Sequence, residues 1–75
     1  MELIATIVIE NVGVREVEDL LEQFLDDYFT YFNFYSSGSD LVVEVHSEDL
    51  DAGDQTADFL EANGYYIVEY INERN

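Results

Sequence analysis

The sequence has 75 residues, a length suited to one domain, and 48% of them are hydrophobic and 15% aromatic, which is enough to form a core. The chain contains eighteen Asp and Glu residues, two arginines and no lysine, so the formal net charge at pH 7 is −16. Such a surface is repelled by DNA, RNA and anionic lipid, and the absence of cysteine excludes disulfides and thiolate chemistry.

The first predicted element is a strand at Glu2–Glu10, where β-branched residues occupy both alternating faces, as in a central strand. A break at Asn11–Gly13 follows it. Apolar residues between Val14 and Tyr28 recur at helical spacing, which predicts a helix with one buried side. That apolar side consists of Val17, Leu20, Leu21, Phe24, Leu25 and Tyr28.

Two strands are predicted next, at Phe29–Tyr35 and Leu41–His46, because both runs favour β-structure and turn-forming residues separate them at Ser36–Asp40. They are expected to pair as a hairpin.

A second helix is predicted at Asp51–Asn63, with small or apolar residues along one side and Asn63-Gly64 as a left-handed stop. A last strand is predicted at Tyr65–Ile71. The buried side of the helix is expected to contain Gly53, Thr56, Ala57 and Leu60.

The element order βαββαβ predicts a single α+β domain spanning residues 1–75. Short right-handed connections favour a ferredoxin-like sandwich, a four-stranded antiparallel sheet in strand order 4-1-3-2 with two helices on one face. No basic leader and no apolar run long enough for a membrane span is present, so we expect no signal peptide, no membrane association and a cytoplasmic location.

Acidic residues on the first helix lie opposite its apolar side, and none is followed by a basic residue three or four positions later. Their spacing, one carboxylate per ~3.3 Å of helix axis, is close to the ~3.4 Å per phosphate of one DNA strand. The second helix repeats the pattern, and the two acidic stripes are expected to lie side by side as one negative surface. The predicted partner-binding residues are Glu16, Glu18, Asp19, Glu22, Asp26 and Asp27 on the first helix, and Asp51, Asp54, Asp58 and Glu61 on the second.

Two other interpretations of these acids stay open. Acids on a solvent-facing helix surface often serve only solvation, although the lack of lysine argues against this, because a surface without a charge preference mixes both signs. Adaptation to high salt is the second alternative.

We expect no catalytic residue, metal or cofactor. The acids between Asp49 and Glu61 fail the calcium-loop pattern, since Gly53 and Leu60 fall where ligands are needed. His46 is the single histidine and has no nucleophile beside it in the sequence. The sequence therefore predicts a protein that is not an enzyme.

The sheet face away from the helices is expected to be open and partly apolar, which suggests a homodimer contact. Its predicted residues are Tyr31, Tyr35, Val42, Ile67 and Ile71.

In size, acidity and unpaired helical acids, the chain resembles the small phage-type anti-restriction and anti-CRISPR proteins that mimic DNA. This resemblance covers composition alone and implies an inhibitor that occupies the basic nucleic-acid-binding channel of a defence nuclease or CRISPR effector, in the host cytoplasm if the chain is phage-encoded.

The segment Val8–Val14, at a strand-to-helix turn, is similar to the ligand loop of ACT regulatory domains, although Val12 replaces the proline common before the glycine. This similarity implies a small regulatory domain that binds a ligand or partner protein.

Overall fold

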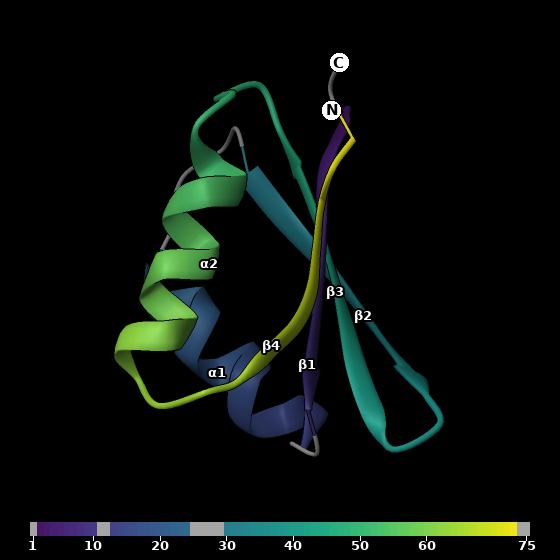
Figure 1. The fold of residues 1–75 in the computed structure, drawn as a ribbon. Helices are drawn as coiled ribbons and strands as arrows, with labels where there is room; N and C mark the ends of the chain where they lie inside the picture. Colours follow the sequence, from purple (N-terminus) through teal and green to yellow (C-terminus); the bar gives the residue numbers. More distant parts are fainter. Residues whose placement is uncertain (1, 11–12, 25–29, 74–75) are drawn as a thin grey trace.

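The computed structural model describes residues 2–10, 13–24 and 30–73. Within these ranges the chain forms a four-stranded antiparallel sheet and two helices, so the predicted α+β class is confirmed (Figure 1). The elements are β1 (Leu3–Glu10), α1 (Val14–Phe24), β2 (Thr30–Ser37), β3 (Asp40–Ser47), α2 (Ala52–Ala62) and β4 (Ile67–Asn72). The end of the first predicted helix, at residues 25–28, lies outside the described residues.

The order of the strands across the sheet is β2-β3-β1-β4. Read from the β4 edge, this is β4-β1-β3-β2, which has the same neighbouring pairs as the order 4-1-3-2. Both helices lie on one face of the sheet (Figure 1). Strands β2 and β4 are therefore the sheet edges, and no described helix covers the opposite face.

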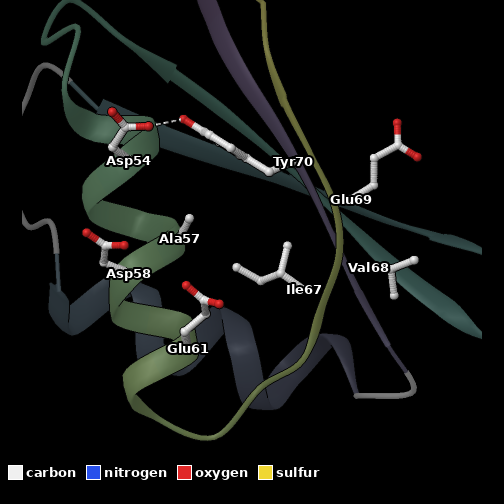
Figure 2. A pocket seen from close by; sticks show the side chains of 8 residues that line it. All are labelled: Asp54, Ala57, Asp58, Glu61, Ile67, Val68, Glu69 and Tyr70. Carbon is white, nitrogen blue, oxygen red and sulfur yellow. Dashed lines mark hydrogen bonds between the residues drawn. The ribbon is translucent and has the colours of Figure 1, made fainter.

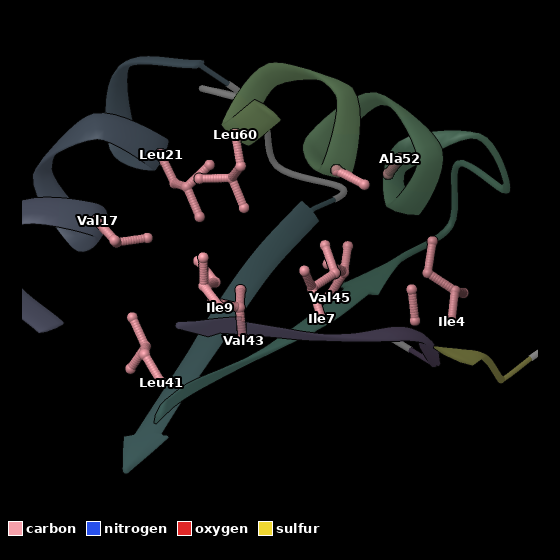
Figure 3. Packing of buried hydrophobic residues seen from close by; sticks show 12 residues of the cluster. Ile4, Ile7, Ile9, Val17, Leu21, Leu41, Val43, Val45, Ala52 and Leu60 are labelled. Atoms are coloured by element: carbon pink, nitrogen blue, oxygen red, sulfur yellow. The ribbon is translucent and has the colours of Figure 1, made fainter. Parts of the chain in front are cut away.

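The core lies between the sheet and the two helices (Figure 3). Alternate residues of β1 and β3 point toward the helices and meet Val17 and Leu21 of α1 and Leu60 of α2, because side chains of a strand alternate between its faces. The apolar strand residues of this layer, each at most 1% exposed, are Ala5, Ile7, Ile9, Leu41, Val43 and Val45.

Helix α2 packs closely on the sheet through small residues, as predicted: Gly53, Thr56, Ala57 and Leu60 are all buried. A Cβ atom at Gly53 would lie 2.7 Å from the Cβ of Ala5 in β1. The absence of a side chain at Gly53 therefore sets how near α2 comes to β1.

The β2–β3 hairpin is longer than the sequence predicts. Ser36 and Ser37 pair with Leu41 and Asp40, so the turn contracts to two residues, of which Gly38 has φ +65°. A two-residue hairpin turn favours positive φ, and glycine adopts this without steric cost. The flanking polar residues can therefore continue the ladder.

The pairing of β4 with β1 contains a β-bulge. Ile9 pairs with Ile67 and Val8 pairs with Glu69, so Val68 is an extra residue in β4. An extra residue reverses the inward and outward alternation of a strand. Ile67 and Tyr70 therefore point toward α2, whereas Val68 and Glu69 point away from it (Figure 2).

Candidate functional site

An open groove of about 460 Å³ lies between α2 and β4 (Figure 2). Ala57 and Ile67 supply apolar surface in it, while three acids of α2 line one wall. These acids are at i, i+4 and i+7, a spacing that places them on one side of a helix. They are Asp54, Asp58 and Glu61, all of them exposed.

Tyr70 and Asp54 join across one end of the groove. The Tyr70 hydroxyl donates a hydrogen bond to the Asp54 carboxylate, with 2.5 Å between the oxygens (Figure 2). Burial raises the pKa of Tyr70 to about 12, and the hydrogen bond and the negative charges of Asp54 and Asp58 act in the same direction. Asp54 therefore has an internal partner, which local sequence patterns could not predict because the two residues are 16 positions apart.

Of the three groove carboxylates on α2, Asp58 and Glu61 have no hydrogen bond or ion pair in the described part of the chain. They are three residues apart on α2, and Glu61 extends toward Ile67 (Figure 2). Glu69 borders the groove, but its side chain points away from α2. The wall formed by α2 thus supplies the available negative charge.

On α1, Glu16 differs from the other predicted acids because the Tyr65 hydroxyl donates a hydrogen bond to it. Burial raises the pKa of Tyr65, and this hydrogen bond and the charge of Glu16 raise it further. The remaining described acids of the helix, Glu18, Asp19 and Glu22, are exposed. Asp26 and Asp27 lie outside the described residues.

The expectation of one continuous acidic surface over both helices stays a prediction. The helices contact each other through Phe24 and Phe59, whose stacked rings have centroids 4.0 Å apart. Successive residues of a helix are rotated by ~100° about its axis. On α2, the acids at 54, 58 and 61 are therefore rotated by about 100–160° from Phe59. On α1, the acids at 18, 19 and 22 are rotated by about 120–160° from Phe24. The described acids of each helix therefore lie away from the Phe24–Phe59 contact.

Basic residues neutralise neither stripe. Arg15 precedes Glu18 by three residues and Asp19 by four, yet the ion pair between His46 and Glu44 is the only one among the described residues. Asp51, the N-cap of α2, is exposed and makes no side-chain capping hydrogen bond. In the described part of the chain, the helical carboxylates thus face solvent without a basic partner.

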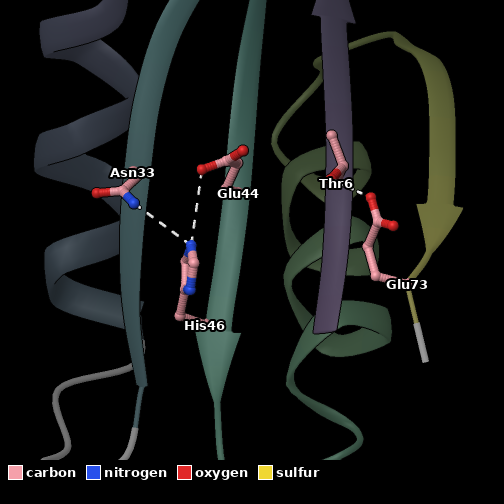
Figure 4. Close-up of polar contacts among 5 residues, drawn as sticks. All are labelled: Thr6, Asn33, Glu44, His46 and Glu73. Atoms are coloured by element: carbon pink, nitrogen blue, oxygen red, sulfur yellow. Dashed lines mark hydrogen bonds and ion pairs between the residues drawn. The ribbon is translucent and has the colours of Figure 1, made fainter. Parts of the chain in front are cut away.

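His46 lies on the open face of the sheet, close to Glu44 as its place in the strand predicts (Figure 4). Its Nε2 atom is 3.6 Å from Glu44 Oε1 and 3.3 Å from Asn33 Nδ2, and its ring stacks on Tyr31 with centroids 4.6 Å apart. No serine, threonine or cysteine side chain bonds to the imidazole. The contacts hold the ring against the sheet and do not form a nucleophile–base pair.

Three of the residues predicted for the dimer face lie on the open face of the sheet. Tyr31, Tyr35 and Ile71 are exposed, and pairing with outward residues of β3 and β1 places them on the open face. Ile67 is a wrong assignment, because the bulge at Val68 turns it toward the core, where it packs against buried residues.

Val42 also contributes little to that face, since it lies between its register partners Tyr35 and Val8 and is only 5% exposed. The homodimer itself stays a prediction.

Within residues 2–10, 13–24 and 30–73, no group of three or more His, Asp or Glu side chains is arranged to hold a metal ion. No helix in these ranges is long and apolar enough to cross a membrane. Residues 11 and 12, at the centre of the loop similar to that of ACT domains, are outside the described residues.

The chain matches no protein-family model, no curated protein and no solved structure. The functional interpretation therefore depends on the geometry and charge described above.

Proposed function

We propose that this protein is a non-catalytic inhibitor that mimics DNA and occupies the basic nucleic-acid-binding channel of a partner, such as a defence nuclease or a CRISPR effector. The observation that carries the proposal is the set of unpaired carboxylates on both helices of a ferredoxin-like sandwich. Glu18, Asp19 and Glu22 on α1 and Asp58 and Glu61 on α2 are exposed and have no basic partner among the described residues, and both helices lie on the same face of the sheet.

Charge explains how such a surface acts. A nucleic-acid-binding channel presents lysine and arginine at positions that fit phosphates, and it attracts any surface that offers comparable negative charge. The exposed acids of the two helices offer rows of carboxylates to such a channel. The inhibitor works in the cytoplasm, where it competes with DNA at a ratio of one chain to one channel.

A competition assay tests the proposal. The protein is used to capture partners from host lysate, and each captured partner is then titrated with fluorescent DNA in the presence of this chain. We expect DNA displacement that saturates at equimolar inhibitor and weakens steeply with salt, because screening shortens the range of the attraction to about 8 Å at physiological ionic strength.

Two double Glu→Lys variants with the same net charge, one inside and one outside the helical acids, are compared in this assay. Glu18→Lys with Glu22→Lys should weaken displacement by at least about tenfold, because each reversal removes an attractive contact and adds a repulsive one. Glu10→Lys with Glu48→Lys changes exposed acids outside both stripes and should retain most of it. A captured partner that still holds DNA at saturating inhibitor, or equal losses in both variants, would refute the proposal.

A further inference from the structure

The groove between α2 and β4 combines two features that a solvating acidic surface does not need. Its wall carries carboxylates, and beside them lies an apolar surface formed by Ile67 and Ala57 (Figure 2). An arginine has the complementary composition, an apolar stem of three methylene groups that ends in a planar cation.

We infer that this groove is a docking site for an arginine side chain on an extended segment of the basic partner, and this inference rests on the proposed function. The arginine stem lies on Ile67 and Ala57, and the guanidinium group reaches the carboxylates of Asp58 and Glu61. Charge complementarity selects this occupant, because four acidic residues, three of them on α2, and no described cation line the groove.

Asp54 has a different role from its two neighbours. Its carboxylate already accepts the hydrogen bond from Tyr70, which closes one end of the groove. Asp58 and Glu61 keep their full acceptor capacity for a partner. A guanidinium group offers five donors in a fixed plane and can bond both carboxylates at once, whereas the ammonium group of lysine is a compact, strongly hydrated charge.

The test is a titration of isotope-labelled protein with the capped tripeptide Thr-Arg-Thr, followed by amide chemical shifts. We expect saturable shifts confined to the groove, at Asp58, Glu61, Ile67 and Tyr70. The tripeptide with citrulline in place of arginine keeps the shape and loses the charge, so it should leave these shifts unchanged.

Two neutral variants with the same net charge separate docking from general attraction. Asp58→Asn with Glu61→Gln should weaken arginine-peptide binding by about tenfold, because both charge-assisted hydrogen bonds are lost. Glu10→Gln with Glu48→Gln should change it by less than about twofold, the range expected for distant surface charges. Circular dichroism and thermal unfolding establish that both variants are folded.

Absence of saturable shifts, shifts spread over α1 as well, or equal losses in the two variants would overturn the inference. The two proposals fail separately. The Asp58 and Glu61 variant is expected to lose peptide binding. If it still displaces DNA from the partner as well as the wild-type protein does, the partner does not use the groove, so arginine docking is overturned and the inhibitor function is intact. If the wild-type protein binds the peptide in the groove but displaces no DNA from any partner, only the proposed inhibitor function is overturned.

Discussion

Two tyrosines near the C-terminus use acids of the helices as hydrogen-bond acceptors. Tyr70 donates to Asp54 on α2, and Tyr65 donates to Glu16 on α1. Partial burial and the adjacent carboxylates both disfavour the phenolate, so the pKa of each tyrosine is raised. Some of the acidity therefore serves the fold, and the remainder is available to a partner.

Alkaline stability provides a test of the Tyr70 contact. Because folding raises the pKa of Tyr70 from 10.0 to about 12, its stabilising contribution is complete below pH 10 and is lost as the pH rises through about 12. Tyr70→Phe should lower the free energy of unfolding by about 1 kcal/mol near neutral pH, the usual value of one hydrogen bond. The difference from wild type should shrink toward pH 12.

Urea unfolding, followed by circular dichroism at several pH values, measures the difference in the free energy of unfolding between Tyr70→Phe and the wild-type protein. Tyr66→Phe is the matched control, since Tyr66 is 67% exposed. It should follow the wild-type curve, and a constant gap between Tyr70→Phe and wild type from pH 8 to 12 would contradict the prediction.

At the scale of elements, the distance between α2 and β1 depends on one missing side chain. Gly53→Ala should destabilise the fold, because its Cβ would meet Ala5 Cβ at 2.7 Å and the Tyr70 hydroxyl oxygen at 3.0 Å. Overpacking of this kind costs about 1–3 kcal/mol, which exceeds the gain of up to about 1 kcal/mol in helix propensity from Gly to Ala.

Chemical denaturation measures the effect, and Gly13→Ala is the control. A Cβ at Gly13 meets nothing within 4 Å, so the same substitution there should change the free energy of unfolding by less than about 0.5 kcal/mol. An increase in stability for Gly53→Ala would show that α2 can move off β1 without loss.

The β-bulge in β4 shows how one residue changes which side chains reach a site. Without the extra Val68, simple alternation would place Ile67, Glu69 and Ile71 on the same face. With it, Ile67 lies in the groove, and Glu69 and Ile71 stay on the open face. The apolar part of the groove therefore depends on pairing between β4 and β1.

At the scale of the whole molecule, the net charge of −16 opposes compaction. Raising sodium chloride from about 0.01 M to about 0.15 M shortens the Debye length from about 30 Å to about 8 Å, so the free energy of unfolding should rise over this range.

The same measurement on Glu18→Gln with Glu22→Gln should show a smaller rise, because two repelling charges on α1 have been removed. A stability that does not depend on salt in the wild-type protein would contradict the prediction.

The sequence alone determined the order of helices and strands and the buried side of α2. These features depend on local periodicity, which a segment carries regardless of its neighbours. The sequence also determined the exposure of the helical acids, since they lie opposite the apolar positions of their own helices.

Only the tertiary structure decided the direction of Ile67, the contact between the two helices and the existence of the groove. Each depends on segments that are distant in the chain: the register of β4 against β1, the stacking of Phe24 on Phe59, and the packing of α2 beside β4. The periodicity of a segment specifies which side of a helix or strand is buried. It does not specify the position of a β-bulge in a pair of strands, nor which neighbouring element each side of a helix faces.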